Sequence, residues 1–197
     1  MPRPYCSYSQ VSLWYKDKNA YIRRYFLNEK QKDTEYTLFG KETHDLIAKD
    51  PQFKDIQFSE YERKVEATVA GVKVMGYIDA LDLSLPYLCD YKTSKNQWTQ
   101  LDVEKLMQLD VYSLLLKLQY GITVKNVGVV WLETAWEEEV LKGSSSKIVL
   151  SKKLVLTGKR KRFERKIYER DRKAAKKWLE KAITEISEAW EEYKNKK

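Results

Sequence analysis

The segment from Gly76 to Tyr112 contains three short motifs in order, Gly76-Tyr-Ile-Asp79, Asp90-Tyr-Lys92 and Gln108-Leu-Asp-Val-Tyr112. The first two motifs lie in apolar-rich runs of strand type, residues 75–83 and 87–93. A turn around Ser84-Leu85-Pro86 joins these runs, because serine and proline are typical turn residues. The sequence therefore predicts a β-hairpin that carries the first two motifs.

This hairpin brings two carboxylates together. If it is symmetric about the Ser84/Leu85 junction, Asp79 lies across from Asp90, with the side chains about 5 Å apart on one face. Two ionised carboxylates at that distance repel, so one is protonated or a divalent cation lies between them. Carboxylate oxygens suit Mg²⁺ or Mn²⁺. Lys92 points to the same side as Asp90, where its ammonium can orient or deprotonate a water molecule if burial and the cation lower its pKa.

The other elements follow from periodicity and from capping residues. Helices are expected over residues 9–27, 34–49, 101–120 and 162–193, with Ser9 or Ser12 and Thr99 as N-caps and Gly121 as a stop. Strands are expected over residues 65–69, 72–79 and 124–132, with a further ribbon over 139–141 and 148–156 around the Gly143-Ser-Ser-Ser146 loop. Ala70-Gly71 forms a tight turn, and the continuous apolar run 124–132 is typical of the middle of a helix-covered sheet.

Length and composition indicate one compact soluble unit. A chain of 197 residues with 43% hydrophobic residues forms a single domain with an adequate core. No apolar run reaches membrane-spanning length, and Met1-Pro-Arg-Pro-Tyr5 lacks the apolar stretch of a secretion signal. We therefore expect no membrane association and a cytoplasmic location, in a prokaryote or in a cell infected by a virus.

The C-terminal region combines an apolar stripe with a strong positive charge. The stripe, at helical spacing, consists of Trp178, Leu179, Ile183, Ile186 and Trp190, and core packing is its expected role rather than partner binding. Between Gly158 and Trp178 there are eleven Lys or Arg and three Asp or Glu, a surplus of +8 that equals the net charge of the chain.

A charged run is usually only a solvated helix face, but beside a reactive centre it can hold phosphates without reading sequence. The candidate phosphate contacts are Lys159, Arg160, Lys161, Arg162, Arg165 and Lys166. Tyrosine and tryptophan are plentiful, and some of them could stack on unpaired bases.

The order G-x-x-D, D-x-K, Q-L-x-x-Y resembles the PD-(D/E)XK nuclease superfamily, and within it the RecB-like branch. Each triplet alone is common by chance, so the specificity comes from order and context. The resemblance implies that Asp79, Asp90 and the main-chain carbonyl of Tyr91 hold metal and that Lys92 activates water. It implies that Gln108 and Tyr112, which share a helix face, steady the lysine and the substrate.

The same branch carries an upstream metal-ligating histidine on a helix. This chain has one histidine, His44, within the expected helix 34–49. A lone histidine is most often an ordinary surface or core residue, and the downstream motifs favour the ligand role. Glu62 precedes the first motif where some relatives have an acidic residue. Asp82 and Asp110 are interpreted as solvated or structural, and Cys89 as a packing residue on the opposite, buried face.

The resemblance covers residues 9–132, the expected core, with residues 158–197 as a basic helical extension. It implies an α/β, three-layer, restriction-endonuclease-like fold with a central mixed sheet flanked by helices and a long C-terminal helix. One RecB-like branch binds an iron-sulfur cluster through four cysteines. The chain has only Cys6 and Cys89, so neither a cluster nor a disulfide framework is expected.

The resemblance implies a stand-alone exonuclease that uses Mg²⁺ or Mn²⁺ to trim single-stranded or duplex DNA ends in replication, recombination or repair. No G-x-x-x-x-G-K-[ST] loop occurs, so the chain acts alone or with a helicase or recombination partner. Three alternatives stay open: a structure-selective endonuclease, a non-cleaving nucleic-acid-binding module with the same fold, and RNA as the substrate.

Overall fold

The computed structural model describes the chain over residues 1–142 and 148–196. Its helices are α1 (Tyr8–Lys16), α2 (Lys18–Tyr25), α3 (Glu35–Lys49), α4 (Gln100–Lys105), α5 (Met107–Tyr120), α6 (Glu169–Asn195) and the 3₁₀ helix η1 (Pro51–Ile56). Its strands are β1 (Tyr5–Cys6), β2 (Glu60–Val69), β3 (Val72–Asp82), β4 (Tyr87–Ser94), β5 (Asn126–Lys142) and β6 (Ile148–Lys166). No helix in these ranges combines the length and the apolar character needed to cross a membrane.

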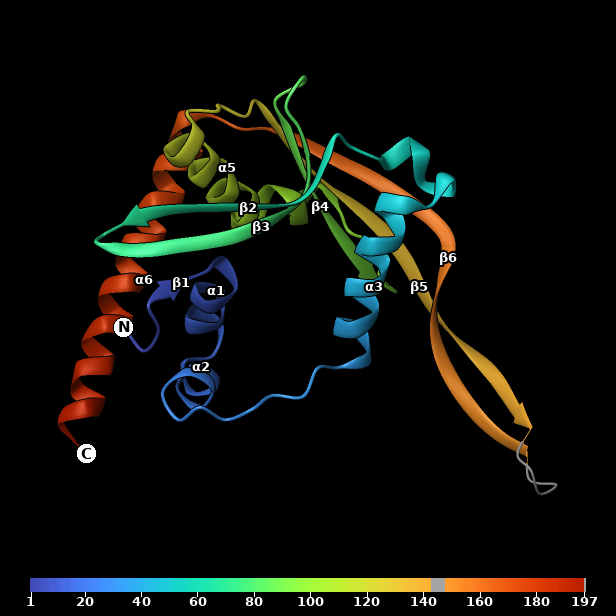
Figure 1. The fold of residues 1–197 in the computed structure, drawn as a ribbon, viewed down its shortest axis with the longest axis horizontal. Coiled ribbons are helices and arrows are strands. Elements are labelled where there is room, and N and C mark those ends of the chain that lie inside the picture. The colour runs from blue at the N-terminus through green and yellow to red at the C-terminus, as the bar shows by residue number, and fades with distance from the viewer. Residues whose placement is uncertain (143–147, 197) are drawn as a thin grey trace.

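The strands form one mixed sheet in the order β1-β3-β4-β5-β6, with β2 paired to β3 (Figure 1). Strand β4 lies between β3, to which it is antiparallel, and β5, to which it is parallel. One face of the sheet packs on α1, α2, α5 and α6, whose apolar residues share one core cluster. The other face packs on α3 and η1 through a second cluster that includes Ile47 and Phe53. The fold is therefore the expected three-layer α/β arrangement with a long C-terminal helix.

The hairpin that carries the motifs is confirmed in its register. Ala80 pairs with Cys89, Leu81 with Leu88 and Asp82 with Tyr87, so the hairpin is centred on the Ser84/Leu85 junction. The turn at Ala70-Gly71 is confirmed too, because both residues have positive φ angles, 49° and 73°, as a tight hairpin turn requires.

The helix expected over residues 101–120 is two helices, α4 and α5. Thr99 does cap the first one, and Gly121, with φ 73°, ends the second. The chain breaks at Leu106, which is extended with ψ 92°. Its N–H bonds the Val103 carbonyl, and Arg165 donates to the same oxygen at 3.1 Å. Helix propensity alone does not reveal a break at this position. The tertiary contacts decide it.

The N-terminal helix is also divided. Asp17 ends α1 and accepts a hydrogen bond from Ala20 N at 2.9 Å, so it caps α2. Ser7, rather than Ser9 or Ser12, caps α1. The sequence does not predict strand β1, since it has only two residues.

The basic stretch before the C-terminal helix is a strand, so its expected helical conformation from residue 162 is wrong. Residues 148–166 form β6, which pairs with β5 as far as Asn126↔Lys166. Phe163 is buried between the exposed Arg162 and Glu164, an alternation that suits a strand. Helix α6 begins only at Glu169, behind a capping box between Tyr168 and Asp171.

Strands β5 and β6 are longer than expected. The strand expected over residues 124–132 continues to Lys142, and it includes the segment 139–141 expected in a separate ribbon. The Gly143–Ser146 loop lies outside the described residues. The stripe on α6 packs as expected, because Leu179, Ile183 and Ile186 are buried in the core. Trp178 and Trp190 pack against that core.

Candidate active site

Strand β4 presents its residues alternately to the two helical layers. Cys89 and Tyr91 are buried in the cluster that contains residues of α3 and η1. Asp90 and Lys92 point to the opposite face, where both contact Gln108 of α5. The packing role expected for Cys89 is consistent with this burial.

Asp90, Lys92, Gln108 and Tyr112 form one hydrogen-bonded group, here named the orienting cluster. Lys92 Nζ lies 2.6 Å from Asp90 Oδ2 and 3.2 Å from Gln108 Oε1. Gln108 Nε2 donates to Asp90 Oδ1 at 2.7 Å and contacts the Tyr112 hydroxyl at 3.2 Å. The carboxylate, the ammonium and the amide therefore fix one another.

Glycine at position 76 makes room for this cluster. A Cβ atom at Gly76 would lie 2.6 Å from Tyr112 Cε1, closer than real Cβ contacts allow. The glycine of the first motif thus lets the Tyr112 ring approach β3 closely. Burial raises the pKa of Tyr112, so its hydroxyl is neutral.

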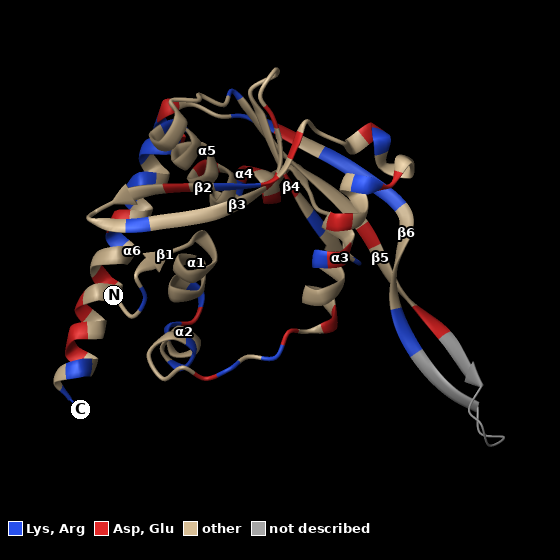
Figure 2. Ribbon diagram, in the orientation of Figure 1, with Lys and Arg blue, Asp and Glu red and all other residues tan. Residues whose placement is uncertain are grey.

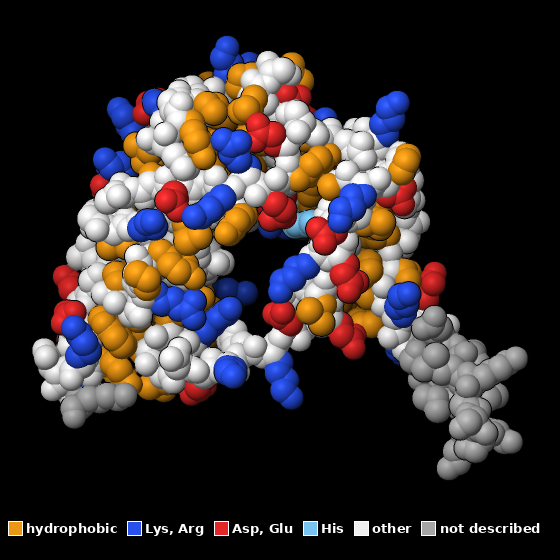
Figure 3. Space-filling view, in the orientation of Figure 1, with side chains coloured by type: hydrophobic (Ala, Val, Ile, Leu, Met, Phe, Trp, Pro, Cys, Tyr) orange, Lys and Arg blue, Asp and Glu red, His pale blue; other side chains and the backbone are white. Residues whose placement is uncertain are grey.

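His44, Glu62 and Asp79 form a second group, here named the ligand cluster. The His44 ring lies between the two acids, with Nδ1 3.5 Å from Glu62 Oε1 and Nε2 3.7 Å from Asp79 Oδ2. One ligand atom from each of the three residues lies within 4.8 Å of the others. Figure 3 shows the histidine at the edge of an opening in the molecular surface, so the cluster is accessible.

Glu62 has a backbone conformation that is unusual for glutamate. Its φ is 48°, in the left-handed region, which costs a non-glycine residue about 1–3 kcal/mol. Glu62 and Asp79 are also missing from an otherwise continuous β2–β3 register, between Tyr61↔Ala80 and Arg63↔Ile78. The distortion turns both carboxylates toward His44. Sequence reasoning gives Glu62 little weight, because no local pattern reveals such a distortion.

The two clusters meet at β4. Tyr91 N donates a hydrogen bond to Asp79 Oδ2 at 2.8 Å, which ties the ligand cluster to the strand of Asp90 and Lys92. The Tyr91 ring is buried, and its hydroxyl donates to the Ile56 carbonyl at 2.9 Å. Asp90 lies outside the close ligand group, although its charge acts on both Asp79 and His44. The part of the Tyr91 carbonyl in binding metal stays a prediction.

Burial and like charge destabilise the ionised carboxylates of the ligand cluster when no cation is bound. Burial raises the pKa of Asp79 to about 7, and the Asp90 charge acts in the same direction. Burial lowers the pKa of His44, but contact with Glu62 and the charges of Asp79 and Asp90 outweigh it, so the net shift is upward. Both residues hold protons more readily than usual, Asp79 mainly because it is buried and His44 because acids surround it.

Lys92 differs from the expectation that its pKa is lowered. Burial does act in that direction, but the charge and hydrogen bond of Asp90 together with the charge of Asp79 outweigh it, and the net pKa is raised. In this arrangement Lys92 is a firmly charged donor rather than a free base. It can orient a water molecule or a phosphate oxygen.

The donor set of the ligand cluster fits a divalent metal ion. Two carboxylates and one imidazole converge from α3, β2 and β3, and Asp90 adds a buried carboxylate beside them. Asp90 Oδ2 has Lys92 nearby but receives no hydrogen bond of good geometry from the described residues. Carboxylate-rich sites of this kind suit Mg²⁺ and Mn²⁺.

The six candidate phosphate contacts lie on β6, along which Lys and Arg recur (Figure 2), and most of them already have partners. Lys159 pairs with Glu133, Arg160 with Asp55, Arg162 with Glu164 and Arg165 with Asp110, while Lys161 lies over the Phe163 ring. Arg165 is the least suited to bind phosphate, since its side chain is 12% exposed and 2.6 Å from Asp110. Lys166 is exposed. Asp110, interpreted as solvated or structural, is structural.

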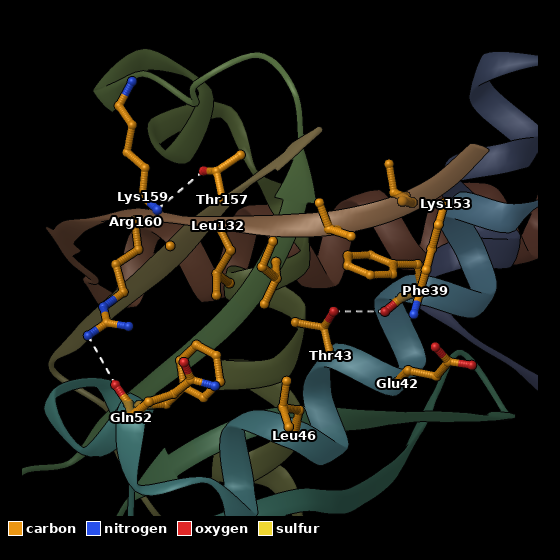
Figure 4. A pocket seen from close by; sticks show the side chains of 15 residues that line it. Phe39, Glu42, Thr43, Leu46, Gln52, Leu132, Lys153, Thr157, Lys159 and Arg160 are labelled. Carbon is orange, nitrogen blue, oxygen red and sulfur yellow. Dashed lines mark hydrogen bonds between the residues drawn. The ribbon is translucent and has the colours of Figure 1, made fainter. Parts of the chain in front are cut away.

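Arg160 belongs to a different part of the surface. Its guanidinium reaches η1, where it pairs with Asp55 at 2.7 Å and donates to the Gln52 carbonyl at 3.2 Å (Figure 4). A cavity of about 590 Å³ lies here between α3, η1 and β6, with Phe39 and Leu46 in its lining. None of the residues of the two clusters lines this cavity, so its size does not make it the reactive centre.

Comparisons with known proteins bear on the fold and on the family of the chain. A search of curated proteins found no match. A solved structure from Eubacterium rectale, provisionally named an exonuclease, aligns with a TM-score of 0.56 at 10% identity, over 95% of this chain and 82% of that chain. A second structure, of SSO0001, aligns at 0.43 with 15% identity, over 89% of this chain and 70% of that one, too weakly to support an argument.

The first alignment supports the fold alone. The model of the PD-(D/E)XK nuclease superfamily, in contrast, matches residues 7–196, which include both clusters, β6 and α6. The chain therefore belongs to the PD-(D/E)XK nuclease superfamily.

Proposed function

We propose that this protein is a divalent-metal-dependent deoxyribonuclease that trims DNA ends. The observation that carries the proposal is the meeting of the ligand cluster and the orienting cluster on β3 and β4, joined by the hydrogen bond from Tyr91 N to Asp79. One cluster has excess negative charge and the other presents a fixed cation. Metal-assisted phosphodiester hydrolysis can use both features, because acidic ligands bind the metal ion and a fixed donor orients water.

In the proposed site, His44, Asp79, Asp90 and the Tyr91 carbonyl hold Mg²⁺ or Mn²⁺, and Glu62 joins them. The bound ion would supply charge stabilisation at the scissile phosphate and make water a better nucleophile. Lys92, held by Asp90 and Gln108, donates a hydrogen bond that orients the attacking water. Tyr112 holds the position of Gln108.

The finer assignments rest on family resemblance. We propose exonuclease action on single-stranded or duplex ends during replication, recombination or repair, in a prokaryotic or virus-infected cytoplasm. A helicase or recombination partner would supply any motor activity. The exposed cations of β6 support a nucleic-acid substrate, and phosphate binding by them would weaken strongly as salt rises.

The test is incubation of end-labelled DNA with Mg²⁺ or Mn²⁺, with and without chelator, for the wild type and for Asp79→Ala. We expect metal-dependent cleavage that the substitution abolishes. Asp45→Ala is the matched control, because Asp45 is an exposed acid next to His44 on α3. DNA labelled separately at each end distinguishes end trimming from internal cleavage. If the wild type binds DNA but leaves it intact under every metal condition, the non-cleaving binding module is the correct function.

A further inference from the structure

A second pocket lies beside the orienting cluster, between the N-terminal segment, β3 and α5. Its volume is about 400 Å³, within the range of pockets that hold small organic groups. Gly76 and Tyr112 form part of its wall. Because the Tyr112 hydroxyl contacts Gln108, the pocket adjoins the candidate catalytic centre. The proposed hydrolysis does not use the rest of it.

The lining has the chemistry of a nucleotide site. Five tyrosines line it, Tyr5, Tyr8, Tyr25, Tyr77 and Tyr112, together with Arg3, two serines and a glutamine. No carboxylate is among the lining residues within the described part of the chain. Aromatic faces bind bases of any sequence by stacking, and hydroxyl and guanidinium groups hydrogen-bond to sugar and phosphate.

Tyr77 and Arg3 are exposed to solvent, so packing of the core does not explain their positions. Tyr77 is 49% exposed although it lies in the middle of β3. The Arg3 guanidinium lies 4.9 Å from the centre of the Tyr25 ring, which keeps a cation over an aromatic face at the pocket. Such an arrangement can hold a phosphate and a base at adjacent positions.

Tyr8 connects the pocket to the reactive residues. Burial raises the pKa of Tyr8, and the charges of Lys92 and Asp90 both act on it. Its ring also packs against Trp178 of α6, with centroids 5.7 Å apart, which fixes its position. Tyr8 therefore contacts α6 through its ring and lies within electrostatic range of Lys92 and Asp90.

We propose that this pocket receives the base of an unpaired nucleotide next to the scissile phosphate, so that the protein acts on single-stranded DNA. The inference rests on the proposed nuclease function and names its substrate class. A duplex could fill the pocket only by unstacking and unpairing a base, at an energetic cost that a single strand avoids. Tyr77 and Arg3 are then specificity-determining residues.

The first experiment measures binding without cleavage, with Ca²⁺ in place of Mg²⁺. A single-stranded oligonucleotide with a fluorescent base analogue is titrated with wild type, Tyr77→Ala and Tyr120→Ala. We expect Tyr77→Ala to weaken binding about 10-fold and to lose the quenching caused by stacking. Tyr120→Ala is the control, because Tyr120 has an exposure similar to that of Tyr77, 42% against 49%, but lies outside the pocket.

The second experiment measures cleavage of strands in which one nucleotide lacks its base, placed at each position in turn. For the wild type, one position near the scissile bond should slow cleavage about 10-fold, while Tyr77→Ala should be insensitive to the missing base. Equal sensitivity of the two proteins, equal rates on single strands and blunt duplexes, or binding of RNA but not DNA strands would overturn the proposal. If no DNA is cut while the binding results hold, only the proposed nuclease function fails.

Discussion

The ligand cluster and the orienting cluster lie side by side on β3 and β4, yet their charges are balanced in different ways. In the orienting cluster, Asp90 faces the Lys92 ammonium at 2.6 Å, and Gln108 bonds both side chains. In the ligand cluster, the two acids share a single imidazole, and burial raises the pKa of Asp79 to about 7. The first group already pairs its carboxylate with an ammonium, whereas the second needs a cation or protons to balance its two acids.

This difference indicates a division of labour. A group that is already neutral and hydrogen-bonded can hold a reactive cation in place before the substrate binds. A group with surplus negative charge attracts an external cation instead. If the division holds, substitutions in the two clusters should change cleavage and metal affinity separately.

The largest effect is expected from Lys92→Met, which removes the ammonium but keeps the aliphatic chain. Cleavage should fall by about 10²–10⁴-fold, since the water or phosphate loses its oriented donor. Mn²⁺ affinity, measured by calorimetry, should stay the same or increase, because Asp90 loses its paired cation. Lys95→Met, just beyond β4, is the control. Wild-type cleavage by Lys92→Met would show that the orienting role is wrong.

The clusters should also separate by metal affinity. Gln108→Ala is expected to lower cleavage about 10–100-fold with little change in Mn²⁺ binding, because Gln108 contacts Asp90 and Lys92 but not the ligand cluster. Asp79→Ala should weaken Mn²⁺ binding more than about 10-fold, since it removes a central ligand. Equal losses of Mn²⁺ affinity in the two variants would contradict the division.

Gly76→Ala tests how the orienting cluster is packed. The added Cβ would lie 2.6 Å from the Tyr112 ring, so we expect destabilisation of about 1–3 kcal/mol in denaturant unfolding. Gly40→Ala is a matched control within helix α3, where the nearest atom is Thr93 Oγ1 at 3.6 Å. That substitution should be neutral or stabilising by up to about 1 kcal/mol. If Gly76→Ala leaves the free energy of unfolding unchanged, the Tyr112 ring can move aside without cost.

The smallest effect is a gain in stability for Asp79→Asn in the metal-free protein. Because the folded state raises the pKa of Asp79 to about 7 from 3.8, it binds more protons than the unfolded state between these values. Stability therefore falls as pH rises through that window. The amide of the Asp79→Asn variant cannot ionise and so avoids the cost of a buried charge. At pH 8 we expect the variant's free energy of unfolding to be higher by about 1 kcal/mol, or roughly 2–4 °C in Tm.

The control for this prediction is pH. At pH 4 the carboxyl of Asp79 is protonated in the folded state, so the Asp79→Asn substitution should confer little advantage there. A stability difference that is the same at pH 4 and pH 8 would rule out the electrostatic explanation. Cleavage should be lost in this variant in either case.

The sequence was sufficient where local rules act. The hairpin register, the Ala70-Gly71 turn and the caps at Thr99 and Gly121 follow from turn chemistry and alternation, and the structure confirms them. The motifs also placed Lys92 and Gln108 on facing elements, and these two side chains are hydrogen-bonded.

The sequence was insufficient where contacts distant in the chain decide the conformation. Arg165 reaches the Val103 carbonyl and Asp110, so the break at Leu106 depends on a strand about sixty residues away. Lysine and arginine suit helices as well as strands, and only pairing with β5 makes β6 extended. Glu62 belongs to the ligand cluster because of its left-handed backbone conformation. The periodicity of the sequence does not predict that conformation.

The β-ladder is interrupted around Asp79, and this interruption affects the dynamics of the backbone. The β2–β3 register omits the Glu62–Asp79 position, and the β3–β4 ladder stops at Ala80↔Cys89. Amide hydrogen exchange should therefore be faster at this point than in the strand segments on either side. Cation binding would draw the loosened segment together and slow that exchange, so metal occupancy could be followed from the backbone alone.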